Sequence, residues 1–225
     1  MTDNTDANPP LKAAMIPVTA FEQNCTLLWC TRTMKGALVD PGGDLDKLKD
    51  ALVQAGVTLE KILVTHGHID HCGQAGILAR EMGVSIEGPH REDLFLLEKL
   101  DTQGKAYGMG GEAFVPQRWL EDGDSVRVGD LELQVIHCPG HTPGHIVFYH
   151  APSKLAIVGD VLFKGSIGRT DFERGNHQQL IDAITGKLWP LGDDVTFIPG
   201  HGPASQFGYE RKVNAFVSDY ALGAA

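Results

Sequence analysis

Residues 65–71 read THGHIDH, and this short stretch places three histidines and one aspartate within six consecutive positions. Imidazole and carboxylate groups at this density indicate bound metal, because Zn²⁺ and related divalent ions favour these ligands. His66 and His68 are two residues apart, so they point the same way in an extended chain. Asp70 and His71 are adjacent, and they can face one site only if the chain turns, as a helix starting near His71 would make it do. The spacing therefore favours two neighbouring ion sites over one.

This stretch follows an apolar, β-rich run, and the same arrangement recurs along the chain. Such runs precede four other polar segments: DPGG at 40–43, PGHTPGH at 139–145, GD at 159–160 and PGHG at 199–202. Polar side chains in loops at strand ends, braced by a rigid scaffold, are the usual place for chemistry. Two ion sites need more ligands than residues 65–71 contain, and these segments offer His141, Asp160 and His201. A carboxylate can bridge two ions, and Asp160 is the candidate, although each of these residues taken singly could be a turn or capping residue.

The periodicity of the rest of the chain predicts sheets with helices packed outside them. β-rich runs occur at 13–18, 25–30, 37–40, 61–66, 124–129, 131–137, 145–150, 154–160 and 195–200, and helical periodicity at 44–55, 72–82, 90–100, 177–188 and 208–220. Linkers rich in Gly or Pro are short, and none resembles an interdomain tether. We expect a disordered lead-in over residues 1–12, followed by a single α/β domain over residues 13–225.

Composition narrows the classes of function and partner. The net charge of −10, from 19 basic and 29 acidic residues, argues against nucleic acid or an anionic membrane as the main partner. No stretch approaches the length of an apolar transmembrane helix, and the first residues lack the apolar core of a signal peptide, so we expect a cytoplasmic protein. The four cysteines form no CxxC pair, and we expect them to be reduced. Composition gives no oligomeric state.

HxHxDH at 66–71, followed by a histidine, an aspartate and a last histidine at strand ends, resembles the metallo-β-lactamase superfamily over residues 14 to 220. The resemblance implies a four-layer αβ/βα sandwich with two divalent metal ions along one edge. It implies two ligand sets that share a bridging carboxylate: His66, His68 and His141 for one ion, Asp70, His71 and His201 for the other, and Asp160 with a water or hydroxide between them. We expect Zn²⁺, with Fe or Mn as alternatives that the same ligands accept.

Within that superfamily, the glyoxalase II branch is the most similar to this chain. HTPGHI at 141–146 resembles its HTxGH signature, with His145 in the place of the second histidine. GDVLFKGSIGRTDFERGN at 159–176 resembles a segment in which a basic residue nine positions after the bridging aspartate contacts glutathione. That residue is Arg169 here, and Lys164 is a second candidate. Length, IPVTAFEQNC at 16–25 and IPGHGP at 198–203 resemble the short bacterial glyoxalase II-like enzymes, which implies a hydroxyacylglutathione hydrolase.

The chain departs from the longer glyoxalase II enzymes in two ways. Asp171 stands where those enzymes have an aromatic residue that contacts glutathione. The chain also ends before the C-terminal helical domain that supplies further glutathione contacts in them. The sequence therefore supports the metal chemistry more fully than the recognition of glutathione.

The resemblance implies hydrolysis of an S-(2-hydroxyacyl)glutathione such as S-lactoylglutathione. Metal binding lowers the pKa of water, so a bridging hydroxide would attack the thioester carbonyl, and a thiolate would leave without a strong acid. Asp70 would orient the water and take up its proton, or serve as a ligand only. Asp40 and His145 would hydrogen-bond around the ligands, although a turn residue and a satisfied core histidine are the alternatives. We give no site role to His90, His137, His150 and His177, and place His177 near a helix start.

The main alternative is a mononuclear-iron persulfide dioxygenase of the same superfamily, which resembles the chain in GRTDF at 168–172. That branch tends to have another residue at the place of His145. A secreted β-lactamase is disfavoured because no signal peptide is recognised, and a nuclease because the chain is acidic and has no extra substrate-binding domain. A non-enzymatic metal-binding module has no need of a two-ion site with an open bridging water.

Overall fold

The computed structural model describes residues 10–223, and its thirteen strands form two main sheets and one small hairpin. Residues 1–9 of the predicted lead-in lie outside the described part, and the first strand already begins at Leu11. The first sheet contains, in spatial order, β1 Leu11–Val18, β2 Gln23–Cys30, β3 Lys35–Val39, β4 Thr58–Leu63 and β5 Ser85–Glu87. The second contains β13 Ser205–Gln206, β12 Thr196–Pro199, β9 Leu155–Gly159, β8 Ile146–His150, β7 Leu131–His137 and β6 Ser125–Val128. The hairpin consists of β10 Leu162–Phe163 and β11 Ser166–Ile167.

Seven α-helices connect or flank these sheets. They are α1 Leu45–Ala55, α2 Ile69–Cys72, α3 Ala75–Met82, α4 Leu94–Leu97, α5 Leu100–Tyr107, α6 His177–Ala183 and α7 Phe207–Val213. Single 3₁₀ or π turns cover Arg91–Asp93, Ala151–Ser153, Ile184–Leu188 and Trp189–Leu191. Helix α1 illustrates the local rules, because Leu48 and Leu52 form its buried stripe and Gly56 ends it in the left-handed conformation at φ 63°. Among residues 10–223, no helix has the length and apolar character needed to cross a membrane.

Successive residues of the central strands pack on opposite faces of their sheets, as the pleat requires. In β2, Leu27 belongs to the cluster under α1 and α3, and its neighbour Leu28 faces the second sheet. In β8, Val147 packs toward α6 and α7, and Phe148 faces the first sheet. Three apolar clusters therefore separate four layers of secondary structure.

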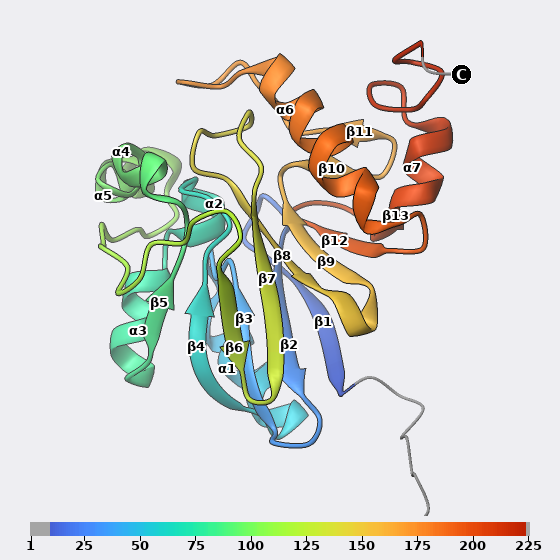
Figure 1. Cartoon of the computed structure of the whole chain (residues 1–225). Helices are drawn as coiled ribbons and strands as arrows, with labels where there is room; N and C mark the ends of the chain where they lie inside the picture. The colour runs from blue at the N-terminus through green and yellow to red at the C-terminus, as the bar shows by residue number, and fades with distance from the viewer. Residues whose placement is uncertain (1–9, 224–225) are drawn as a thin grey trace, which may run out of the picture.

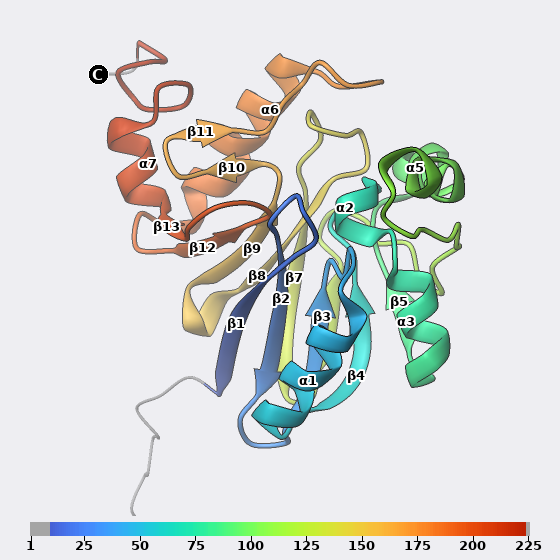
Figure 2. The ribbon, with the colours of Figure 1, turned by 180° about the vertical axis from the view of Figure 1, so that it is seen from behind.

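The predicted four-layer αβ/βα sandwich is confirmed. Helices α1 and α3 cover the outer face of the first sheet, and α6 and α7 cover the outer face of the second (Figure 1). The view from behind shows α1 in front of β2–β4, with α6 and α7 on the other side of the molecule (Figure 2). The polar segments that follow β3, β4, β7, β9 and β12 gather at one edge, between α2 and β10.

The structure corrects three of the predicted helices. The turn after His68 begins at Ile69 and not near His71, and the expected 72–82 helix divides into α2 and α3. The expected 90–100 helix breaks into a 3₁₀ turn and α4, and α5 continues to Tyr107 although Gly104 lowers its helix propensity. The expected 208–220 helix ends at Val213, where the Asn214 backbone becomes extended at ψ 128° and its side chain bonds the carbonyl oxygen of Ser166 and the Glu210 carboxylate.

Candidate metal centre

The chain leaves β4 in an extended conformation and then turns, which brings four polar side chains to one place. His66 is fully buried, and His68 has φ −71° and ψ 147° just before α2. Helix α2 carries Asp70 and His71, and its first turn aims both toward the same edge of the sandwich as the two preceding histidines. Residues 65–71 thus contribute two members to each of two donor clusters.

The first cluster consists of three imidazoles. Nε2 of His66 lies 3.1 Å from Nδ1 of His68, and Nε2 of His141 lies 3.0 Å from the same atom. His141 reaches them from the loop after β7, 73 residues further along the chain. Three nitrogens that converge at this separation match the spacing of neighbouring ligands around one Zn²⁺-sized ion.

The second cluster consists of Asp70, His71 and His201. Oδ2 of Asp70 lies 3.2 Å from Nε2 of His201 and 3.8 Å from Nε2 of His71. Asp160, directly after β9, stands between the two clusters: its Oδ1 is 3.3 Å from Nε2 of His71, and its Oδ2 is 3.5 Å from Nε2 of His141. The structure thus brings together all seven residues that the sequence singled out as candidate ligands.

Hydrogen bonds on the far side of the rings show that these donors fit metal ions. Nδ1–H of four histidines donates to an oxygen: His66 to Thr65 Oγ1, His71 to Asp40 Oδ2, His141 to the Arg169 carbonyl and His201 to the Phe21 carbonyl. Each bond points Nε2 of its ring toward the cluster, which is the usual arrangement of metal-binding imidazoles; any proton on Nε2 must leave before that nitrogen can bind an ion. Nε2 of His71 and Oδ1 of Asp160 are buried, and neither makes a hydrogen bond of acceptable geometry despite their 3.3 Å separation.

Close approach of the backbone completes this arrangement at Gly200 in PGHG. A Cβ atom there would lie 2.1 Å from Oδ1 of Asp160 and 2.5 Å from Cε1 of His71. Any larger residue would therefore displace the carboxylate that lies between the clusters. The glycine at this strand end is needed for close packing against the site.

The two clusters differ in electrostatics. In the first, burial lowers the pKa of His66 well below its usual value, lowers that of His68 to about 3 and lowers that of His141. In the second, burial alone would also lower the pKa of His71, but the Asp160 and Asp70 carboxylates outweigh it and hold it well above the usual value. The first cluster is therefore uncharged at neutral pH, and the second is a network of imidazolium and carboxylate groups.

Asp40 lies beneath both clusters. Its Oδ2 accepts from Nδ1–H of His71 at 2.9 Å and from Oγ1–H of Thr65 at 2.6 Å, and its Oδ1 accepts from the Thr65 N–H at 2.7 Å. Thr65 in turn accepts from His66. Asp40 therefore bonds His71 directly. It also reaches His66 through Thr65, a residue that the sequence did not indicate.

Comparison with known proteins identifies the family. The sequence model of the metallo-beta-lactamase superfamily matches residues 18–201. The chain belongs to the metallo-β-lactamase superfamily. Hydroxyacylglutathione hydrolase GloC of Haemophilus influenzae is 43% identical over 206 residues, which cover 91% of this chain and 97% of that protein.

Solved structures agree with this assignment. The B3 metallo-beta-lactamase BLEG-1 matches with a TM-score of 0.84 and 30% identity, over 92% of this chain and 99% of that one. TTHA1623 in a di-iron-bound form matches with 0.80 and 31% identity, over 90% and 99%, and ETHE1 from Myxococcus xanthus with 0.77 and 25%, over 92% and 84%. The predicted superfamily and the prediction of a hydrolase are confirmed, and the clusters fit a dinuclear metal site. Because one neighbour holds two irons, Zn²⁺ stays a prediction.

In this superfamily member, His145 lies behind the clusters. It is fully buried, its ring stacks on that of His66 at 4.6 Å between centroids, and its Nε2 accepts from the Asp160 N–H at 3.0 Å. Burial lowers the pKa of His145 well below its usual value, so the ring is neutral with its proton on Nδ1. His145 therefore holds the backbone of Asp160 and packs against His66.

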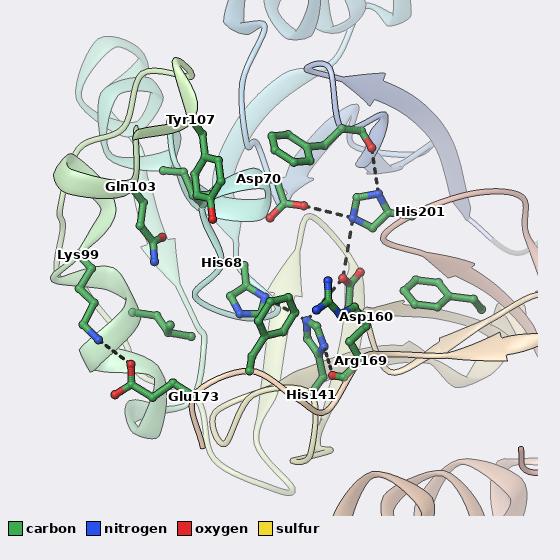
Figure 3. A pocket seen from close by; sticks show the side chains of 15 residues that line it. His68, Asp70, Lys99, Gln103, Tyr107, His141, Asp160, Arg169, Glu173 and His201 are labelled. Atoms are coloured by element: carbon green, nitrogen blue, oxygen red, sulfur yellow. Dashed lines mark hydrogen bonds and ion pairs between the residues drawn. The ribbon is translucent and has the colours of Figure 1, made fainter. Parts of the chain in front are cut away.

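A cavity of about 550 Å³ opens over the clusters. Figure 3 shows Lys99, Gln103 and Tyr107, from the α4–α5 segment, on one side together with Glu173, and Arg169 beside Asp160 and His141. Its lining also includes the aromatic side chains of Phe21, Phe163 and Phe172. The cavity thus combines an apolar wall with cationic groups at its mouth.

The two predicted substrate-binding cations are placed differently. Arg169 lines the cavity, but its guanidinium forms a two-point pair with Asp171 at 2.8 and 2.9 Å and lies 4.4 Å from the centroid of the Phe172 ring. Lys164 occupies the turn of the β10–β11 hairpin and is not among the residues that line the cavity. Lys99, which the sequence did not suggest, lines it and pairs with Glu173 at 2.7 Å.

Sequence reasoning also missed Asp93, which lies close to the centre but outside the cavity lining. Its carboxylate is buried and accepts hydrogen bonds from the loops on both sides of the first cluster. Burial raises the pKa of the Asp93 carboxyl to about 6, although these bonds oppose the shift. In the sequence, HRED reads as the polar start of a helix, so nothing local could have indicated this role.

Proposed function

We propose that this hydrolase cleaves S-(2-hydroxyacyl)glutathione thioesters such as S-lactoylglutathione. The observation that carries the proposal is the pair of donor clusters that share Asp160 beneath a cavity with cationic groups at its mouth. The likeness to GloC, whose name gives that activity, supports the same substrate class. The neutral His145 behind Asp160 agrees with the HTPGH segment of that branch.

We assign two divalent ions to the clusters, with Zn²⁺ expected and Fe or Mn as alternatives. His66, His68 and His141 would hold one, Asp70, His71 and His201 the other, and Asp160 would bridge them. When bound, two such ions supply a water of lowered pKa and a Lewis acid for the thioester carbonyl.

Asp70 is the proposed catalytic side chain. It lines the cavity, and although burial alone would raise its pKa, His71 and His201 hold it below the usual value. An ionised carboxylate can accept a hydrogen bond from the attacking water and so orient it. The departing group is a thiolate with a pKa of about 8.5, which leaves without a protonated acid beside it.

Recognition of the glutathione part falls to the cationic groups of the cavity mouth. Glutathione carries two carboxylates, and Arg169 offers a planar pair of N–H donors that suits such groups. In the structure that guanidinium already donates two hydrogen bonds to Asp171, so a substrate carboxylate would compete with Asp171 for it. Lys164 remains a candidate only if the β10–β11 turn moves toward the cavity.

We further place the protein in the cytoplasm, with no nucleic acid or membrane as partner.

Hydrolysis of S-lactoylglutathione by the wild type and by His68→Ala, with metal content measured on both, tests the proposal. We expect the variant to lose at least about 100-fold in kcat/KM, because a ligand of the nucleophile-generating site is gone. His177→Ala, at an exposed histidine that begins α6, is the matched control and should keep full activity. Equal rates in wild type and His68→Ala would contradict the proposal. So would one iron per chain with oxygen uptake on glutathione persulfide, which would favour the dioxygenase.

A further inference from the structure

The carboxylate of Asp93 joins two loops that are distant in sequence. Asp93 ends the 3₁₀ turn before α4 and is completely buried. Its Oδ2 accepts from the Gly67 N–H and from the Thr142 hydroxyl, both at 2.8 Å, and its Oδ1 accepts from the Gly144 N–H at 2.6 Å. All three donors are uncharged, so hydrogen bonds alone compensate for the burial of this group.

Each donor lies between residues of the metal centre. Gly67 separates His66 from His68, and Thr142 directly follows His141. Asp93 therefore ties the loop with two members of the three-histidine cluster to the loop with the third. Its hydrogen bonds go to none of the three rings, so its effect on the cluster passes through the loops.

Both loops pack so closely that only glycine fits, Gly144 against Asp93 itself and Gly67 against Leu96 in the following helix. A Cβ at Gly144 would lie 2.6 Å from the Asp93 nitrogen and 2.7 Å from its Oδ1. A Cβ at Gly67 would lie 2.7 Å from Cβ of Leu96 and 3.2 Å from the Asp93 carbonyl oxygen. Gly67 and Gly144 thus both donate a hydrogen bond to the Asp93 carboxylate, and neither position has room for a larger side chain.

We propose that Asp93 is a positioning residue that sets the separation of the two loops, and with it the geometry of the three-histidine half of the metal centre. The inference rests on the proposed function only in taking His66, His68 and His141 as ligands of one ion. The other half does not depend on Asp93: His71 is held by Asp40, and His201 by the Phe21 carbonyl. Asp40 also reaches His66 through Thr65, so it supports both halves.

Asp93→Asn tests this dependence with little change of volume. The amide keeps one acceptor oxygen, but its NH₂ group cannot accept from Gly67 or Thr142. Loss of such an outer hydrogen-bond partner lowers metal affinity by about 10- to 100-fold in comparable sites. We expect that loss in the three-histidine half alone. Thr142→Val, which removes one of the three bonds, should give a smaller loss in the same half.

The experiment isolates each half by removing the other. His201→Ala leaves the three-histidine half intact, and His68→Ala leaves the Asp70–His71–His201 half intact. Co²⁺ is titrated into metal-free protein of each background by calorimetry, with and without Asp93→Asn. We expect affinity to fall about 10- to 100-fold in the His201→Ala background and to change less than about twofold in the other. Asp40→Asn should lower affinity in both, and Glu98→Gln, at an exposed carboxylate that follows α4, in neither.

The outcomes separate this inference from the proposed function. Equal losses in both backgrounds, or no loss in either, would overturn the positioning role. Circular dichroism and thermal unfolding of each variant show whether the fold is kept, and a globally loosened fold would also appear as equal losses. If the selective loss is found and the wild type hydrolyses no glutathione thioester, the inference stands and the proposed substrate falls.

Discussion

The two halves of the metal centre are built from one stretch of sequence, yet they differ in charge and in support. The three-histidine half is uncharged, and one buried carboxylate, Asp93, joins the loops that carry it. The other half combines imidazolium with carboxylate groups and draws on Asp40 and a backbone carbonyl. The first half is therefore ready to accept a cation without losing protons, and the second must lose them first.

Histidines of a single sequence motif need not have similar pKa values. Side chains at positions 66 and 68 leave an extended chain among other imidazoles, where burial dominates their pKa. The side chain at position 71 leaves a helical turn and meets Asp40, Asp70 and Asp160, whose charges outweigh burial. His66 and His71 are both fully buried, so the identity of their neighbours accounts for the opposite shifts of their pKa values.

Asp160→Asn should have the largest effect on metal binding and activity, because it weakens both halves of the metal centre. Its carboxylate lies within 3.5 Å of His71 and His141, one from each cluster. We expect bound metal to fall in both halves and kcat/KM for S-lactoylglutathione to fall at least about 100-fold. Asp46→Asn, at a fully exposed aspartate, is the control. Elemental analysis that found one half still filled would show that the halves do not share this ligand.

Gly200→Ala should damage one half more than the other. The added methyl group would meet Oδ1 of Asp160 and Cε1 of His71, while nothing from the three-histidine cluster is among its nearest neighbours. We expect a loss of about 10-fold or more in affinity for the second ion, comparable with loss of an outer partner. Gly186→Ala, where an added Cβ meets nothing within 4 Å, should bind both ions normally. Normal binding of both ions by Gly200→Ala would show that the backbone after β12 can shift enough to accommodate the added methyl group.

The pH dependence of metal uptake should also distinguish the halves. The Asp160 and Asp70 carboxylates hold the pKa of His71 well above its usual value and a hydrogen bond to Asp70 raises that of His201, so this half retains protons to higher pH than the other and releases them when an ion binds. Affinity of that half should therefore rise with pH by up to about tenfold per unit for each proton released. The three-histidine half, with the pKa of His68 at about 3, should change little between pH 6 and 8. Calorimetry on His68→Ala and His201→Ala at several pH values measures both, and parallel slopes would contradict the comparison.

The sequence predicted most of the centre because its signals are local. HxHxDH specifies alternation along a strand and then a turn, and a glycine or proline beside each later donor marks a strand end. The sandwich follows from recurring apolar runs of strand length, separated by helical periods. Two- and three-residue strands such as β5 and β13 are too short to show any period, so they were missed.

What the sequence could not predict depends on tertiary contacts. The burial of Asp93 results from the two loops that close over it, and neither loop is near it in sequence. Lys164 was predicted to attract the glutathione carboxylates, but it occupies the β10–β11 turn and does not line the cavity, whereas its neighbour Phe163 does. Lys99 reaches the cavity only because α4 and α5 fold back over the centre.

Asp171→Asn should have the smallest effect, and it extends the comparison from the metal to the mouth of the cavity. Arg169 and Asp171 are both about two-thirds exposed, so their pair is weak. Freeing the guanidinium should lower KM for S-lactoylglutathione by about twofold and leave kcat unchanged, because neither side chain is among the proposed metal ligands. Asp219→Asn breaks a similar pair with Arg211 on α7, and its KM should equal that of the wild type. If Asp171→Asn raised KM, the carboxylate would be helping to hold the substrate, and the cationic site would lie elsewhere on the rim, with Lys99 the next residue to vary.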